Sequence, residues 1–332
     1  MQDENTSNSP PLMINTNLEV SDSITQIFDK ILKRILLYLS KPSVIALING
    51  LFSKSHFPPD SEVEYDHTEN VDSKLKKTVA DIIITLRTKD HVRRFHLEGQ
   101  INDDNAIVIR IFEYGFQDAL KHQTTHGNKI TLPFPAPVII FLEHTESTPD
   151  EVILELDFGE HGKVNYPVPA MKFLNYSVEE ICEKQMTILL PLYLLKLRRD
   201  VENAKARRHH KEATLRQCAK KLKALIEQNI LPAITENEKA GNITHSDAFE
   251  LIRLLDRLYW YLYGSISEFK DEEVDSVFAD VIELKYDKEF AEERARHLEE
   301  KRQIAHDLKN EGVPIEIIAK TTKLPACEIE RL

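Results

Sequence analysis

The segment TVADIIITLRTKDHVRRFHLEGQ, residues 78–100, contains two apolar runs separated by a short polar turn. The runs, Val79 to Leu86 and Val92 to Ile101, are rich in Ile, Val, Leu and Phe, as β-strands are. Lys89 and Asp90 make up the turn between them. The pattern predicts a β-hairpin.

The turn also fixes which residues of the hairpin lie opposite each other. Arg87 faces Val92, and further along Asp81 faces Glu98, with Cβ atoms about 4.5–5.5 Å apart. Gln100 shares the face of Glu98, because side chains alternate along a strand. Two such carboxylates suit Mg²⁺, which takes one or two protein carboxylates and completes its shell with water and phosphate oxygens. The alternative is an exposed hairpin whose acidic residues only increase solubility. The apolar residues on either side of Asp81 make this alternative less favourable.

A helix is expected after the hairpin, from N-caps among residues 102–104 to about His122. Arg110, Tyr114 and Gln117 are spaced to share one face of this helix. Arginine binds phosphate in a bidentate manner, and tyrosine can stack or donate a hydrogen bond. Arg110 and Tyr114 are therefore candidate substrate contacts, and the alternative is that they belong to an ordinary helix surface.

Residues 21–52 have helical periodicity and precede the hairpin. Asp29 and Lys33 lie four residues apart and so on one face. One interpretation is a solvated ion pair. The other is that this helix packs beside the hairpin and directs Asp29 or Lys33 into the site.

The hairpin and helix residues together resemble a known pattern: Asp81, then Glu98-Gly99-Gln100, then Arg110 and Tyr114. This pattern is similar to that of the PD-(D/E)xK nuclease superfamily, and in particular to its bacterial recombination-promoting nuclease, or transposase-like, family. Three further blocks resemble this family in the same order: Phe28 to Phe52, Ser177 to Arg199 and Ile304 to Leu332. The resemblance covers most of the chain from about residue 22.

The resemblance implies an α/β fold: a restriction-endonuclease-like core of αβββαβ type, with a mixed β-sheet flanked by helices, followed by an all-α C-terminal region. It also implies a metal-dependent DNA endonuclease linked to recombination or mobile elements. Asp81 and Glu98 would hold Mg²⁺, with Mn²⁺ as a substitute, and Gln100 would orient water or substrate. The signature Lys of the superfamily is replaced by neutral Gln100, so Lys33 is the candidate for the missing positive charge.

Four segments are expected along the chain: a disordered N-terminus (1–20), the nuclease-like domain (21–176), a helical region with a basic patch (177–289) and a helix-turn-helix-like tail (290–332). Within the nuclease-like domain, further strands are expected at 61–65 and 138–143, and a second hairpin at 152–168. Ser177 to Glu180 has the form of a capping box that opens a helix through Leu197.

Residues 196–223 carry eleven Lys or Arg and three acidic residues, a net charge of +8. This basic patch is either a DNA-binding surface or the solvated face of a helix. The aromatic stretch Leu251 to Gly264, with Trp260, is interpreted as core rather than as a base-stacking platform. The last helix of the tail carries two Glu and one Arg, which favours an interaction or packing module, and the helical C-terminal region could form homo-oligomers.

The composition restricts the function and the compartment that can be expected of the protein. A net charge of −12 counts against non-specific DNA binding by the whole chain. Three scattered cysteines show neither a disulfide framework nor a zinc spacing, and no apolar run is long enough to span a membrane, so a cytoplasmic protein is expected. Two functional alternatives stay open: a nuclease-fold interaction protein without turnover, and a nuclease that acts on RNA.

Overall fold

The computed structural model describes residues 24–52, 56–71, 77–101, 106–207 and 209–270, together with scattered residues from Arg302 to Ile329. The chain forms two compact units, residues 1–270 and 271–332. The N-terminus predicted to be disordered lies outside the described residues.

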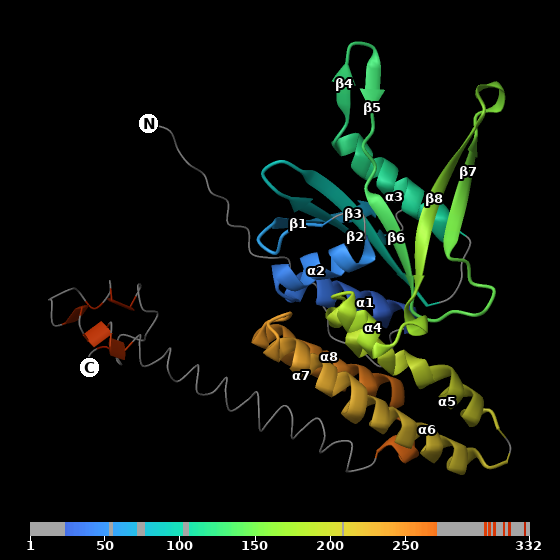
Figure 1. Cartoon of the computed structure of the whole chain (residues 1–332), viewed down its shortest axis with the longest axis vertical. Helices are drawn as coiled ribbons and strands as arrows, with labels where there is room; N and C mark the ends of the chain where they lie inside the picture. Colours follow the sequence, from blue (N-terminus) through green and yellow to red (C-terminus); the bar gives the residue numbers. More distant parts are fainter. Residues whose placement is uncertain are drawn as a thin grey trace. The chain divides into compact units, whose positions relative to one another are not determined.

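The first unit is built around a mixed six-stranded sheet in the order β1-β2-β3-β6-β8-β7 (Figure 1). Its strands are β1 (Glu62–Val71), β2 (Lys77–Arg87), β3 (Val92–Gln100), β6 (Ala136–Phe141), β7 (Glu151–Asp157) and β8 (Lys163–Lys172). The pairs β1–β2, β2–β3 and β7–β8 are antiparallel, whereas β3–β6 and β6–β8 are parallel. A separate small hairpin, which the sequence analysis did not predict, consists of β4 (Thr124–His126) and β5 (Lys129–Thr131). The predicted α/β class with a mixed sheet flanked by helices is confirmed.

Helices cover both faces of the sheet and form a further layer beneath it (Figure 1). The first three are α1 (Ile24–Tyr38), α2 (Lys41–Leu51) and α3 (Ile107–Lys121). The lower layer contains α4 (Val178–Glu183), the 3₁₀ helix η3 (Thr187–Leu197), α5 (Arg198–Lys205), α6 (Lys211–Leu225), the π-helical turn η4 (Ile226–Ile230), α7 (Leu231–Lys239) and α8 (His245–Tyr263). Short 3₁₀ turns occur at η1 (Gly159–His161), η2 (Phe173–Asn175) and η5 (Ser267–Phe269).

The register of the β2–β3 hairpin is the one expected from its turn. Arg87 pairs with Val92, and the Thr88 amide donates to the carbonyl of His91 at 2.8 Å. The pairing extends to Ile82 and Leu97, the neighbours of Asp81 and Glu98. The side chain of Asp81 itself lies outside the described residues.

Two predicted helices are interrupted. In place of the one helical segment predicted for residues 21–52, the described part of this segment forms two helices, α1 and α2, because Ser40 is extended (ψ 147°) and Pro42 lies in the first turn of α2. The helix expected from Ser177 to Leu197 has its predicted capping box but ends at Glu183. Gln185 then takes a left-handed conformation, and the chain continues as a 3₁₀ helix that contains Pro191.

Asp247 joins the turn between α1 and α2 to the first turn of α8. Its carboxylate is buried and accepts hydrogen bonds from the Ser40 amide at 2.7 Å and the Ser43 hydroxyl at 2.8 Å. It also forms a capping box with Thr244. Burial alone would raise the pKa of Asp247, but these hydrogen bonds outweigh burial and hold the pKa below its ordinary value.

The second unit contains a small apolar cluster of Ala305, Ile318 and Ile329, each fully buried. Lys309 Nζ donates to the carbonyl of Ile329 at 3.1 Å. The described residues of this unit are helical. The helix-turn-helix-like arrangement, the predicted segment boundaries and oligomerisation through this region stay predictions.

Gly50 tests the contact between α2 and the chain that leads into η3. A Cβ atom at this position would lie 2.3 Å from the carbonyl oxygen of Lys184 and 2.7 Å from Met186 Cγ. Helix propensity alone would make Gly50→Ala more stable by about 1 kcal/mol. We expect the opposite, a loss of roughly 1–3 kcal/mol in urea unfolding, because the clash involves backbone.

The matched control for Gly50→Ala is Gly99→Ala. At Gly99 the new methyl group would meet only Leu32 Cδ2, the end of a flexible side chain, at 3.0 Å. We expect the smaller loss there. Equal losses at the two positions would contradict the packing explanation.

Asp247→Asn should give a pH-dependent loss of stability. Because the folded-state pKa is lowered, the carboxylate contributes stability above the unfolded pKa of about 3.9, and this contribution is lost as the pH falls through the folded pKa. We expect the variant to be about 2–3 kcal/mol less stable at pH 7, with the difference shrinking towards pH 3. Urea unfolding at both pH values measures this, with exposed Asp150→Asn as the control. A difference that is constant with pH would rule out the carboxylate as its origin.

Candidate functional site

The two faces of β3 differ in character. Phe95, Leu97 and Gly99 point towards α1 and α2: the Phe95 ring lies 4.8 Å from that of Phe52, and Gly99 contacts Leu32. Arg94, His96, Glu98 and Gln100 alternate with them and so lie on the opposite face, under α3. The strand therefore carries an apolar row and a polar row.

Three residue pairs join the polar row of β3 to α3: Arg94 with Asp118, His96 with Tyr114, and Glu98 with Arg110. The closest atoms of the two ion pairs are 2.7 and 2.6 Å apart, and the two rings of the middle pair lie 6.1 Å apart. Successive paired residues are two positions apart on β3 and four positions apart on α3. Two residues of a strand span about 6.8 Å and four residues of a helix span about 6.0 Å. Because these two distances are similar, three successive pairs can form between the strand and the helix.

Glu98 is the carboxylate of the polar row of β3, and 1% of the residue is exposed. Its Oε1 accepts hydrogen bonds from Arg110 Nη2 at 2.6 Å and from Gln100 Nε2 at 2.5 Å. Its Oε2 is buried and has no hydrogen-bond partner among the described residues. A buried carboxylate oxygen without a partner is unfavourable by itself, and it is the kind of hard ligand that Mg²⁺ takes. The residue therefore fits one ligand position of a divalent metal.

The other predicted site residues are placed only in part. Lys33 is buried, with 8% exposed, in α1, which packs on the Gly99 face of β3. Asp29 lies in α1 and Asp81 in β2, and the side chains of both lie outside the described residues. In the part of the chain that is described, no group of three or more His, Cys, Asp or Glu side chains is arranged to hold a metal ion.

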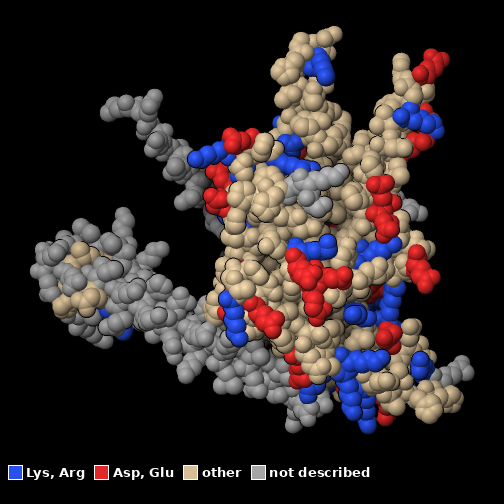
Figure 2. Space-filling view, in the orientation of Figure 1, with Lys and Arg blue, Asp and Glu red and all other residues tan. Residues whose placement is uncertain are grey.

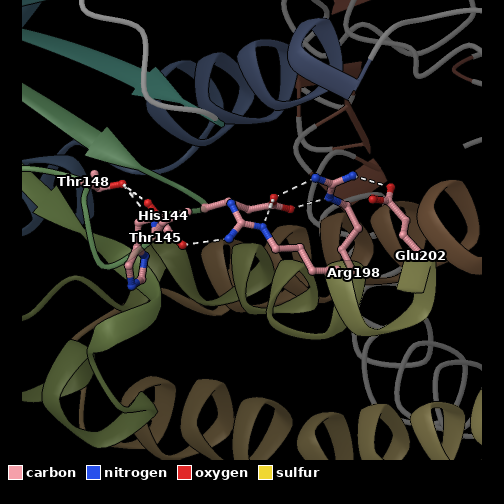
Figure 3. Close-up of polar contacts among 7 residues, drawn as sticks. His144, Thr145, Thr148, Arg198 and Glu202 are labelled. Carbon is pink, nitrogen blue, oxygen red and sulfur yellow. Dashed lines mark hydrogen bonds and ion pairs between the residues drawn. The ribbon is translucent and has the colours of Figure 1, made fainter. Parts of the chain in front are cut away.

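A second buried carboxylate, Glu143, lies just beyond the end of β6. Its two oxygens accept hydrogen bonds from Arg198 Nε and Nη2, and Oε2 also from Arg199 Nε at 3.0 Å (Figure 3). Arg199 Nη1 donates to the carbonyl of His144 at 2.8 Å, and Arg198 Nη1 to Glu202 at 2.5 Å. The hydrogen bonds to Glu143 raise the pKa of Arg198. We call this group the Glu143 clamp.

The Glu143 clamp lies at the same end of the sheet as the Glu98 site. Gln100 pairs with Phe141 across the parallel β3–β6 ladder, and the Leu142 amide donates to the Gln100 carbonyl at 2.7 Å. Glu143 is the next residue along the chain. The sequence analysis missed this role, although a charged residue that ends the apolar run VIIFLE was a signal for it.

The predicted basic patch forms an exposed surface on α5, α6 and the residues next to them at the end of η3 and after α5. Figure 2 shows Lys and Arg side chains gathered over these helices. The described basic residues that are exposed there and lie outside the Glu143 clamp are Lys196, Lys205, Arg207, Lys211, Arg216, Lys220 and Lys221. Arg198 and Arg199 contribute less charge to this surface because they pair with Glu143. The remaining lysines and arginines are sufficient to contact several phosphates.

Comparisons with known proteins identify no relative of this chain. No family model, curated protein or solved structure matches the chain. Across the described residues, the helices are all too short or too polar to cross a bilayer.

Arg110→Met tests whether the Glu98–Arg110 pair supports the site. The substitution leaves the buried Glu98 carboxylate with only the Gln100 amide, so we expect a loss of about 2–4 kcal/mol in urea unfolding. Adding Glu98→Gln should recover part of this loss. The exposed pair of Lys163 and Glu155 is the control, and Lys163→Met should change stability by less than about 1 kcal/mol. Strictly additive effects of Arg110→Met and Glu98→Gln would show that the pair is not coupled.

Proposed function

We propose that the chain is a metal-dependent DNA endonuclease with a restriction-endonuclease-like core, associated with recombination or mobile-element activity. The observation that carries this proposal is the buried Oε2 of Glu98, which has no hydrogen-bond partner among the described residues and lies at the end of β3. The order of elements supports it: a helical segment, three antiparallel strands, the crossover helix α3 and the parallel strand β6 correspond to an αβββαβ core.

In this proposal Glu98 and Asp81 hold the metal. A bound Mg²⁺ would supply a hydroxide nucleophile near neutral pH and offset charge on the scissile phosphate. Gln100 donates its amide N–H to Glu98, which leaves its carbonyl oxygen to orient water or substrate. The register of β2 and β3, which reaches the residues next to Asp81 and Glu98, supports placing the two carboxylates together.

Positive charge at the site would come from Arg110. Arg110 uses one nitrogen for Glu98 and is 39% exposed, so its other N–H groups can reach a phosphate. Tyr114 is buried against His96, which supports a role in shaping the site rather than in touching DNA. Lys33 and Asp29 belong to α1, which packs on the Gly99 face of β3, opposite to the face that carries Glu98, so this packing does not support a place for either residue beside the metal.

The basic surface of α5 and α6 would hold the DNA backbone. The Glu143 clamp fixes α5 to the end of β6, so this surface has a defined position relative to Glu98. Phosphate contacts of this kind weaken steeply as salt is raised.

A second candidate is a nuclease-fold protein that binds without turnover. The observation that favours it is that Glu98 Oε1 is already engaged by Arg110 and Gln100. An ion pair at this position stabilises a carboxylate without a metal. The same surfaces could also serve a substrate made of RNA.

Plasmid cleavage separates these candidates. With Mg²⁺ or Mn²⁺ we expect the native chain to nick or linearise plasmid DNA, and we expect chelator to stop it. Asp81→Ala and Glu98→Gln should each lower the rate at least about 100-fold, since even residues that only support metal ligands change activity by about 10–100-fold. Glu113→Gln, an exposed position on α3, is the matched control and should keep the native rate.

Three other outcomes of the cleavage assay are informative. DNA binding without any cleavage would select the binding protein, and cleavage of RNA alone would select the RNA substrate. Cleavage that survives both Asp81→Ala and Glu98→Gln would place the active site elsewhere.

A further inference from the structure

A cleft of about 500 Å³ lies between α5 and the end of α8. Its charged and aromatic lining includes Arg198, Glu202, Lys205, Trp260, Tyr261 and Tyr263. A neighbouring cleft of about 450 Å³ shares Lys205 and Ser265 with it and adds Lys211 from α6. Because they share lining residues, the two clefts form a groove along the edge of the basic surface.

Trp260 is the only tryptophan of the chain and is 38% exposed, whereas its helix neighbours Tyr259 and Tyr263 are 1% exposed. The prediction that the stretch Leu251 to Gly264 belongs to the core is confirmed for most of its apolar residues and is wrong for Trp260. The indole is nevertheless held in place: it meets Tyr259 edge to face at 5.8 Å, and a Cβ on Gly264 would lie 2.6 Å from its Cε3. A fixed, partly exposed aromatic surface is suited to stacking.

The charges along the groove are unevenly compensated. Among the described residues, Arg198 forms ion pairs with Glu143 and Glu202, but the structure records none for Lys205 or Lys211, which are both exposed. Acidic residues line the outer cleft, so the shared position at Lys205 is the more favourable one for an anion. The groove thus places an aromatic surface beside uncompensated positive charge.

We propose that this groove binds single-stranded nucleic acid, with one unpaired base stacked on Trp260 and the adjacent phosphates held by Lys205 and Lys211. Stacking on an aromatic side chain needs a free base face, which a duplex does not offer. A cleft of about 500 Å³ lies within the range of about 300–1,000 Å³ that holds small-molecule ligands, so it accommodates a nucleotide but not a duplex. This site is separate from the Glu98 site and requires no metal.

The single tryptophan makes the site directly measurable. The full chain, in chelator, is titrated with an unlabelled oligothymidylate of about 12 nucleotides, a length typical of single-strand sites. We expect saturable quenching of Trp260 fluorescence. Lys205→Ala should weaken the affinity several-fold, and Lys239→Ala, an exposed lysine on α7 outside the groove, should leave it unchanged.

Binding is measured independently by anisotropy of a labelled oligonucleotide. Trp260→Ala should weaken the affinity by about 5- to 150-fold, the usual range for loss of one stacked base, and Trp260→Phe should keep most of it. A circular dichroism spectrum of each variant excludes unfolding as the cause. Lys205 lies on the surface, so its variant tests the site even if Trp260→Ala fails to fold.

Several outcomes would overturn the inference: no quenching at saturating oligonucleotide, equal quenching by a duplex of the same length, or an unchanged affinity in Lys205→Ala. Glu98→Gln should bind the oligonucleotide with native affinity. Loss of the proposed nuclease function would therefore leave this site intact, and its absence would leave the nuclease proposal standing.

Discussion

The ion pair of Glu98 and Arg110 is the interaction on which the arrangement of the site depends. A carboxylate with 1% exposure needs a compensating charge, and α3 supplies it. The similar repeat distances of β3 and α3 then bring Tyr114 to His96 and Asp118 to Arg94. Helix and strand are thus fixed in register by polar contacts, while apolar contacts hold the other face.

The Glu143 clamp adds a second set of buried polar contacts, which connects the sheet to the helical layer. Glu143 follows the strand that pairs with Gln100, and its partners begin α5. Asp247 makes a comparable link between α8 and the turn before α2. Two buried carboxylates therefore tie the lower helices to the core. The basic surface and the Glu98 site are therefore held at a fixed separation, which the proposed nuclease function requires.

The sequence predicts the local geometry well. The turn at Lys89 and Asp90 fixes the register of β2 and β3, and helical spacing brings Arg110 to the face that meets Glu98. The sequence does not predict features that depend on contacts between residues far apart in the chain. The Glu143–Arg198 pair joins residues 55 positions apart, and the exposure of Trp260 depends on how α8 meets α5. The placement of Asp81 opposite Glu98 stays a prediction.

The depth of the Glu143 clamp has a practical consequence. Glu143 and the side chain of Arg198 are only 2% and 16% exposed, so mobile ions screen this pair weakly. The exposed lysines of α5 and α6 have no such protection, and their hold on a polyanion falls steeply with ionic strength. Concentrated salt should therefore release a polyanion bound to these lysines and leave the Glu143 clamp intact.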